Sequence, residues 1–439
     1  MHPPSLRPAT QTADRPAAAP RRARAPRVLQ LGKYYPPVPG GIETVARELT
    51  EGLNRAGIAT DVLCAGLSRR TVVERADTGY RIVRTGSWAR LLSTAVSPAM
   101  VATLREVRDD YDLVHLHMPD PMAVLAVLAT RPAARLVLHW HSDVIRQRVA
   151  MHAYRPLQEW ALRRADAIVA TSQAYADSSE ALRRWRDKFT VIPIGVSDSR
   201  ARVRAGQVHA IRARYAGRRI VFSLGRMTHY KGFTVLARAA AALPDDWVVL
   251  IGGDGIELDG LRRFVSQHRL GDRVHVLGHI GGDALPAHYA ACDVFCLPST
   301  LRAEAFGVSI VEALLMGKPV VATDIPGSGV PWVNRHGFTG LNAPAGDAAG
   351  LAGALNALIG DPLLRQRFGA AARLRYLHEF GVDRMVARTL QLYESLGLAP
   401  APFAPPLPAD ARPERTSHPE SVARDARPEF VRRASPVSP

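Results

Sequence analysis

The sequence lacks the features that mark a membrane-spanning or secreted protein. None of its apolar runs approaches the ~18 residues that a membrane-spanning helix needs. Residues 1–26 contain prolines and arginines but no apolar segment of the kind that a signal peptide requires. The only cysteines are Cys64, Cys292 and Cys296, too few for a disulfide framework, which indicates a reducing compartment. We therefore expect a cytoplasmic protein.

Lysine is scarce, although the chain is basic. Lysine and arginine number 57 against 40 acidic residues, a net charge of +17, but lysine occurs at only four positions. Such a charge is typical of proteins that bind nucleic acid, anionic membranes or phosphorylated small molecules. Because there is no nucleic-acid recognition module and no aromatic platform, we expect no nucleic-acid partner. Basic residues are dense in 146–188 and 200–219, with Trp160 and Trp185 interspersed. We expect this basic surface to contact an anionic membrane peripherally, at the inner face of the cytoplasmic membrane.

The remaining composition is that of an ordinary globular protein. The 439 residues are 47% hydrophobic and 22% charged, enough for two or three domains. The ends, 1–26 and 400–439, are rich in proline and contain few large apolar groups. We predict that both are disordered, because they bury too little surface to offset the entropy of ordering.

Between the ends, short apolar runs alternate with segments of helical periodicity. Val45, Leu49 and Leu53, for example, share one face of a predicted helix that stops at Gly57. Continuous apolar strands separated by amphipathic helices are typical of parallel sheets covered on both faces. The predicted strands are 27–32, 60–65, 81–85, 113–118, 135–141, 167–171, 190–194, 219–225, 247–252, 273–278, 294–298, 319–323 and 340–342.

These strands are too many for one sheet, and the arginine-rich segment 198–218 has no strand pattern. We therefore predict an α/β protein of two Rossmann-like, doubly wound domains, 27–205 and 206–381, facing each other across a cleft. Ligands of such domains lie beyond the carboxyl ends of the strands. We therefore expect the site residues to lie in the segments that follow strands.

Gly40 and Gly41 open a helix after the first strand. Glycine permits close backbone approach, and a helix N-terminus offers free N–H groups to an anion. The segment does not match the GxGxxG fingerprint, which argues against a nicotinamide cofactor. A tight turn that simply needs glycine remains an alternative interpretation.

Arg226 and Lys231 lie in one loop, SLGRMTHYKGF, between a strand and a helix. Two cations at a helix N-terminus are suited to a diphosphate. Lys231 is notable because this chain nearly always uses arginine, and a compact ammonium suits a point contact with phosphate. The alternative is a solvated loop with ordinary surface charge.

Glu304 and Glu312 bracket the segment AFGVSIV, the first in a loop after a strand and the second within the following helix. One carboxylate could accept hydrogen bonds from sugar hydroxyls and the other from ribose hydroxyls, with the backbone N–H groups around Phe306 and Gly307 between them. Either residue alone is explained equally well as a carboxylate favoured by the helix dipole.

Four histidines lie in two pairs at strand ends, in LVHLHMP and LVLHWHSD. Members of each pair share a face of their strand: His115 with His117, and His139 with His141. A zinc site is disfavoured because no carboxylate spacing supports it, and Cys292 and Cys296 lack a second ligand pair. The DYD segment beginning at Asp110 is better explained as a strand cap than as a metal motif. We expect no metal.

Together these segments resemble the retaining GT-B glycosyltransferases of family 4, the "glycosyl transferases group 1" family. The similarity spans about residues 27–396, and GRMTHYKG, EAFGVSIVE, ACDVFCLPS and GKPVVATDIPG are its most specific parts. The resemblance implies an NDP-sugar donor, a glycan or polyprenyl-linked acceptor, and a final helix, 382–399, that crosses back to the first domain. The stretch 328–334 is similar to mannosyl- and rhamnosyltransferases of bacterial polysaccharide assembly (exopolysaccharide, capsule or lipopolysaccharide).

The same resemblance implies roles for individual residues. Arg226 and Lys231 would bind the diphosphate, and Gly40–Gly41 would lie against the phosphates. Glu304 and His141 would contact the transferred hexose, and Glu312 would bind the ribose. The implied mechanism is metal-independent and retaining, with the acceptor attacking the face from which the diphosphate leaves. The rival functions are another GT-B sugar-nucleotide enzyme, such as an epimerase or a phosphorylase, and a basic nucleic-acid-binding protein.

Overall fold

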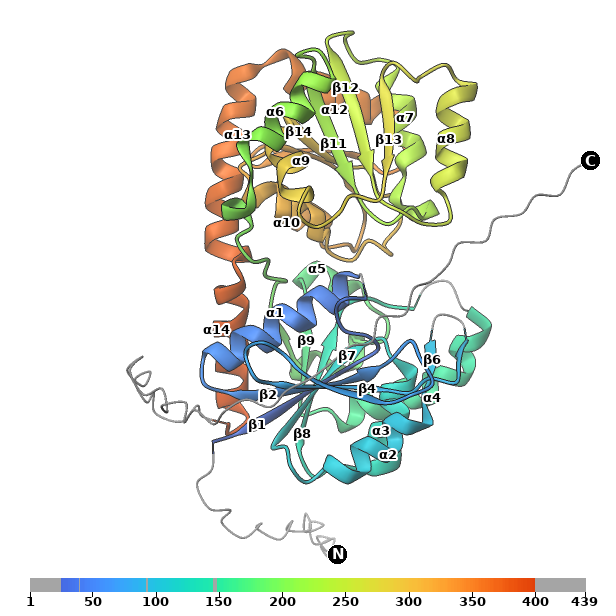
Figure 1. Cartoon of the computed structure of the whole chain (residues 1–439), viewed down its shortest axis with the longest axis vertical. Helices are drawn as coiled ribbons and strands as arrows, with labels where there is room; N and C mark the ends of the chain where they lie inside the picture. Colours follow the sequence, from blue (N-terminus) through green and yellow to red (C-terminus); the bar gives the residue numbers. More distant parts are fainter. Residues whose placement is uncertain (1–24, 39, 92–93, 145–147, 399–439) are drawn as a thin grey trace, which may run out of the picture. The chain divides into compact units, whose positions relative to one another are not determined.

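The structure is a computed structural model that describes residues 25–38, 40–91, 94–144 and 148–398 (Figure 1). The two tails predicted to be disordered lie outside these residues, apart from 25 and 26. Within the described part of the chain, no helix is both long enough and apolar enough to cross a bilayer.

The first domain is built on a sheet of strand order β10-β9-β8-β7-β1-β2-β4-β3. Every pair is parallel except β3–β4, which is antiparallel. The sequence analysis missed β3 and the separate β5–β6 hairpin because these strands are only three or four residues long. The strands are β1 (Arg27–Gly32), β2 (Ala59–Ala65), β3 (Val72–Arg75), β4 (Arg81–Thr85), β5 (Ala89–Leu91), β6 (Thr94–Val96), β7 (Leu113–Met118), β8 (Arg135–Trp140), β9 (Ala167–Ala170) and β10 (Phe189–Val191).

The second domain is built on a wholly parallel sheet of order β13-β12-β11-β14-β15-β16. The prediction of two Rossmann-like, doubly wound domains is therefore confirmed. The strands are β11 (Arg219–Leu224), β12 (Trp247–Gly252), β13 (Val274–Gly278), β14 (Val294–Leu297), β15 (Val320–Asp324) and β16 (Gly340–Pro344).

Helices cover both faces of each sheet (Figure 1). In the first domain these are α1 (Gly41–Arg55), α2 (Pro98–Val107), α3 (Pro121–Thr130), α4 (Arg148–Arg164) and α5 (Gln173–Ser178). The later helices are α6 (Ala205–Arg214), α7 (Phe233–Ala240), α8 (Leu258–Gln267), α9 (Leu285–Ala291), α10 (Val308–Leu315), α11 (Val330–Val333), α12 (Ala348–Gly360), α13 (Pro362–Arg375) and α14 (Val382–Ser395).

Helix α1 follows the predicted pattern. Val45, Leu49 and Leu53 are at most 1% exposed and pack in the core below the helix. Burial of each such side chain contributes roughly 1.5–3 kcal/mol. The helix stops before Gly57, whose φ of +86° is unfavourable for other residues.

The two faces of the first sheet bury alternate residues of the same strands. Leu113 and Val137 pack in a cluster with residues of α1 and α14, whereas Val114 and Leu136 pack with residues of α2, α3 and α4. Because His115 and His117 are two and four residues beyond Leu113, they lie on the α1–α14 side of the sheet. Tyr393 of α14 reaches His115 on that side.

Both strand orders reverse at a defined point. In the first sheet β1 lies between β2 and β7, and in the second β11 lies between β12 and β14. Doubly wound sheets bind ligands outside the carboxyl ends of the strands at such a switch point. The loops that follow β1, β7, β11 and β14 are therefore the expected location of a site.

Candidate active site

A buried ion pair joins the loops that follow β11 and β14. Lys231 Nζ lies 2.6 Å from Glu304 Oε2, and both side chains are about one-tenth exposed. Ser299 also donates to Glu304 Oε2 over 2.9 Å. Burial lowers the pKa of Lys231, but Glu304 and Tyr230 together outweigh burial, and the pKa lies above its ordinary value. Lys231 is therefore a permanent, positioned cation at the switch point of the second sheet.

Gly232 allows these two loops to approach each other. Its φ is +67°, and a Cβ atom there would collide with the carbonyl oxygen of Pro298. Lys231 ends a short 3-10 turn, His229–Lys231, immediately before this glycine. The spacing of KGF after β11 therefore places the ammonium against the loop that carries Glu304.

Arg226, in contrast to Lys231, is exposed. Its charge acts on Lys231, and on Glu43 and Lys33 of the first domain. Burial raises the pKa of Glu43, and Lys33 and Arg226 oppose that rise. The loops after β1 and β11 therefore bring three cations, Lys33, Arg226 and Lys231, close enough for the charge of Arg226 to lower the pKa of the other two. Such a concentration of positive charge is typical of an anion-binding site.

Gly40 and Gly41 lie at the start of α1, as predicted. Both are exposed, and a Cβ at Gly41 would meet no atom within 4 Å. A Cβ at Gly40 would instead collide with the Glu43 carboxylate. The helix N-terminus is thus open at Gly41 and occupied by an acidic side chain beside Gly40.

Phe306 and Gly307 precede α10. Phe306 is only 3% exposed, and its ring meets Phe380 edge-on, with centroids 6.0 Å apart. Because this side chain is buried in the core, only the backbone of Phe306 can contact a ligand. Gly307, with φ of +86°, is the N-cap of α10.

Glu312 lies within α10, where it accepts a hydrogen bond from the hydroxyl of Tyr289 over 2.6 Å. Burial raises the pKa of Glu312, although Tyr289 and Lys231 act in the opposite direction. Lys231 is thus electrostatically coupled to both glutamates, and the structure brings these three predicted site residues together.

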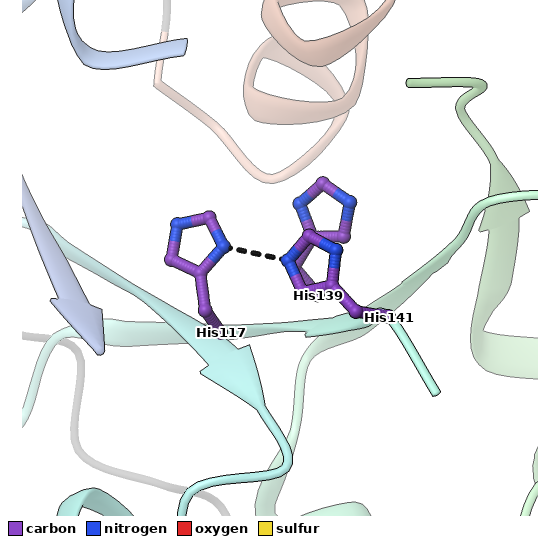
Figure 2. Close-up of side chains that lie close together, drawn as sticks. All are labelled: His117, His139 and His141. Carbon is purple, nitrogen blue, oxygen red and sulfur yellow. Dashed lines mark hydrogen bonds between the residues drawn. The ribbon is translucent and has the colours of Figure 1, made fainter. Parts of the chain in front are cut away.

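The four histidines form one buried cluster in the first domain, and Figure 2 shows three of them, His117, His139 and His141. His141 Nε2 lies 2.9 Å from His117 Nδ1, and His141 stacks on His139 with ring centroids 4.1 Å apart and planes 11° apart. His115 Nε2 lies 3.1 Å from His139 Nδ1. His141 directly follows β8, at the carboxyl edge of the sheet.

Among the described residues, His117, His139 and His141 are the one group of three that could hold a metal ion by distance, with ligand atoms within 4.8 Å of one another. Two of these histidines are already joined through ring nitrogens. The nearly parallel planes of His139 and His141 direct their lone pairs side by side rather than towards a common point, unlike a tetrahedral zinc site. The geometry favours a hydrogen-bonded network.

Comparison with known proteins identifies the family of the chain. Residues 39–200 match the family described as Glycosyltransferase Family 4, and residues 207–375 match Glycosyl transferases group 1. O-antigen chain mannosyltransferase C of Escherichia coli is 32% identical over 374 residues, which cover 84% of this chain and 98% of that protein. This chain belongs to the family 4, group 1 glycosyltransferases.

Two further proteins are similar to the glycosyltransferase. D-rhamnosyltransferase WbpZ of Pseudomonas aeruginosa is 32% identical over 81% of this chain and 92% of its own length. The solved structure of Anabaena HepE in complex with UDP-glucose has a TM-score of 0.69 at 23% identity, and the match covers 84% of this chain and 99% of HepE.

An ion pair between the two domains of the glycosyltransferase links the loops that carry His141 and Glu304. Arg302 Nη1 lies 2.6 Å from Asp143 Oδ2, and the guanidinium lies over the Tyr175 ring, 4.2 Å from its centroid. Asp143 is two residues after His141, and Arg302 is two residues before Glu304. The pair therefore ties together the loops that carry the two candidate sugar contacts.

Sequence reasoning missed several residues that organise this site. Gln30 had a usable signal, because it is a polar residue within the otherwise apolar strand β1. Tyr289, Arg302 and Asp143 had no local signal, since their partners in this site are distant in the sequence. Ser299 was also missed, although its partner Glu304 is only five residues away.

Proposed function

We propose that the glycosyltransferase is a retaining enzyme that moves a hexose from an NDP-sugar to a glycan or polyprenyl-linked acceptor in bacterial polysaccharide assembly. The observation that carries the proposal is the buried Lys231–Glu304 pair at the switch point of the second sheet. The names of the similar mannosyl- and rhamnosyltransferases support a hexose, and the UDP-glucose complex of HepE supports a nucleotide-sugar donor.

In this mechanism the diphosphate is the leaving group, and negative charge grows on it in the transition state. Lys231 and Arg226 stabilise that charge, and the N-termini of α1 and α10 add backbone N–H groups. Glu304 holds the sugar from the second domain, and His141 holds it from the first. Glu312 accepts from the ribose.

The acceptor hydroxyl attacks the face of the sugar from which the diphosphate departs. Its proton passes to a phosphate oxygen of the leaving group, so the new glycosidic bond forms as the bond to phosphate breaks. The protein accelerates the step by positioning the reactants and by stabilising the leaving group.

A donor screen tests the proposed function. Among UDP-, GDP- and dTDP-sugars, we expect one to raise the melting temperature, because a ligand that binds only the folded state stabilises it. NMR of the product formed from that donor should show the anomeric configuration of the donor. An inverted product would refute the retaining mechanism, and conversion of the donor sugar to its epimer without transfer would favour an epimerase.

We also propose that catalysis is independent of metal, since Lys231 and Arg226 supply the positive charge that a divalent ion supplies elsewhere. Turnover should be unchanged in excess EDTA. Loss of activity that is restored by Mn²⁺ or Zn²⁺ would refute this and return attention to His117, His139 and His141.

The proposed membrane contact needs a different surface from the one expected in the sequence analysis. Trp160 and Trp185 pack partly buried against the core of the first domain, so they do not form a free apolar surface. Arg164 donates to backbone carbonyls, as does Lys188. We therefore do not assign the membrane contact to these two tryptophans.

A more suitable surface lies at the β3–β5 region of the first domain. Leu67, Val73, Trp88 and Leu91 are each more than 60% exposed. The segments that carry them adjoin, since Ser87 donates its N–H to the carbonyl oxygen of Ser68 over 2.8 Å. Exposed arginines are interspersed at positions 69, 70 and 90. We assign the peripheral contact with anionic membrane to this patch, because apolar anchors and basic residues together suit such a surface.

Co-sedimentation with liposomes tests the patch. The wild type should pellet with anionic vesicles at low salt, and the double variant Trp88→Ser/Leu91→Ser should pellet several-fold less. Ile256→Ser, which removes an apolar side chain 80% exposed on the second domain, is the matched control and should behave as the wild type. Equal recovery of wild type with neutral and anionic vesicles would refute the contact.

A further inference from the structure

We propose that Gln30 and His117 are positioning residues that hold His141 as the tautomer with its proton on Nε2. The lone pair on Nδ1 of His141 then accepts a hydrogen bond from a hydroxyl of the transferred sugar. The sugar contact rests on the proposed function, whereas the tautomer is a property of the protein itself.

The three residues come from three adjacent strands. Gln30 is on β1, His117 is on β7, and His141 directly follows β8. In the sheet, Gln30 pairs with His115 across β1 and β7, and His117 pairs with His139 across β7 and β8. All of these side chains are buried, so loss of one partner would leave a buried polar atom unsatisfied.

The proton positions follow from the chemistry of Gln30. Its Oε1 can only accept a hydrogen bond, and it lies 2.9 Å from His117 Nε2. His117 therefore carries a proton on Nε2. A neutral imidazole has a single N–H, so Nδ1 of His117 is an acceptor.

The same donor–acceptor argument applies to His141. The Nε2 atom of His141 lies 2.9 Å from the accepting Nδ1 of His117, so it must be the donor (Figure 2). If His141 is also neutral, its Nδ1 carries a lone pair. An amide on β1 thus sets the hydrogen-bonding role of a ring two strands away.

The buried setting keeps both rings neutral at pH 7. Burial lowers the pKa of His117 to about 3. Burial also lowers the pKa of His141 well below its ordinary value, and the neighbouring histidines act in the same direction. Because neither ring carries a second proton, Gln30 alone determines which nitrogen of His117 and of His141 donates and which accepts.

The other two histidines form a separate branch. Tyr393 Oη lies 2.7 Å from His115 Nδ1, and His115 continues to His139. His139 meets His141 by ring stacking, which fixes the plane of His141 but not the position of its proton. Orientation of the ring and choice of tautomer are therefore supplied by different neighbours.

The experiment is NMR of the full chain with ¹⁵N-labelled histidine and without donor, using long-range ¹H–¹⁵N correlations assigned by the loss of signals in His141→Gln. We expect wild-type His141 to be protonated on Nε2 alone. In Gln30→Met, which keeps side-chain length but removes the acceptor, His141 should show both tautomers. The kcat of Gln30→Met should fall about 10-fold, which is comparable with the effect of removing other residues that orient a functional histidine.

Thr130→Val is the matched control. It removes a buried hydrogen bond, from Thr130 to the Ala126 carbonyl, in α3 on the opposite face of the same sheet. We expect the His141 tautomer and kcat of this variant to match the wild type. A comparable loss of kcat in Thr130→Val would show that Gln30→Met acts through general destabilisation, and would overturn the positioning role.

Two NMR results would overturn the inference directly. A wild-type His141 protonated on Nδ1 would mean that the Gln30 amide is reversed, and a single tautomer in Gln30→Met would mean that Gln30 does not control it. The sugar contact is tested with donors that lack one hydroxyl. If the tautomer is as stated but every deoxy donor is affected equally in wild type and His141→Ala, the sugar contact is refuted while the positioning by Gln30 stands.

Discussion

Replacement of Lys231 by alanine is expected to lower kcat at least ~100-fold, as loss of one preorganised donor to a developing anion does in other enzymes. The ammonium is held against Glu304 at 2.6 Å, so little reorganisation is needed when charge appears on the leaving diphosphate. Steady-state kinetics with the donor identified by the screen measures the effect. Arg226→Ala should also lower kcat strongly, because Arg226 is the second cation of the same loop.

Folding must be checked for Lys231→Ala, because this change leaves a buried carboxylate without its partner. Such a loss typically lowers the free energy of unfolding by about 3–5 kcal/mol. Circular dichroism and the melting temperature provide that check. Arg238→Ala, an exposed cation on α7 of the same domain, is the control and should keep wild-type turnover. Near-normal turnover of both Lys231→Ala and Arg226→Ala, with folding intact, would refute the diphosphate site.

Alanine variants of the two glutamates should differ in whether substrate binding or turnover is impaired. Glu312→Ala should weaken binding of the free nucleoside diphosphate roughly 10-fold or more, the expected effect of losing a hydrogen bond to a charged group. The ribose is bound alike in ground and transition states, so this change raises KM more than it lowers kcat. Glu304→Ala should lower kcat mainly, because its partner is the reacting sugar.

Calorimetry with the free diphosphate separates the two roles. Tyr289→Phe tests the Glu312 assignment further, since it removes the hydroxyl that holds this carboxylate at 2.6 Å while keeping the ring. It should weaken nucleotide binding less than Glu312→Ala does. Equal affinity of wild type and Glu312→Ala would contradict the ribose role.

The sequence was most informative where physical constraints are local. Strands such as β12 and β14 are apolar throughout because helices cover both faces, and this makes them recognisable without a partner. Loops after such strands lie at the carboxyl edge of the sheet, so Lys231 and Glu304 could be expected at the same edge of one sheet from their positions. Gly57 was similarly readable as the end of a helix, since a positive φ is a local demand.

The rest depended on contacts between distant segments. Arg302 and Asp143 are 159 residues apart, and neither has a neighbour pattern that indicates the other. Strand β3 is four exposed residues that exist only as an edge on β4. Trp185 was expected to face solvent, but its ring packs against a core that local periodicity could not reveal.

The last helix has a consequence for how the chain is made. Helix α14 packs on α1, and its Tyr393 is bonded to His115, a residue 278 positions earlier. At about 5–20 residues per second, His115 leaves the ribosome's active site roughly 15–55 s before Tyr393 is added. Throughout that interval one apolar face of α1 and the histidine network stay uncovered, available to chaperones and open to aggregation. The first domain is therefore completed only after the second domain has been translated, when helix α14 is added.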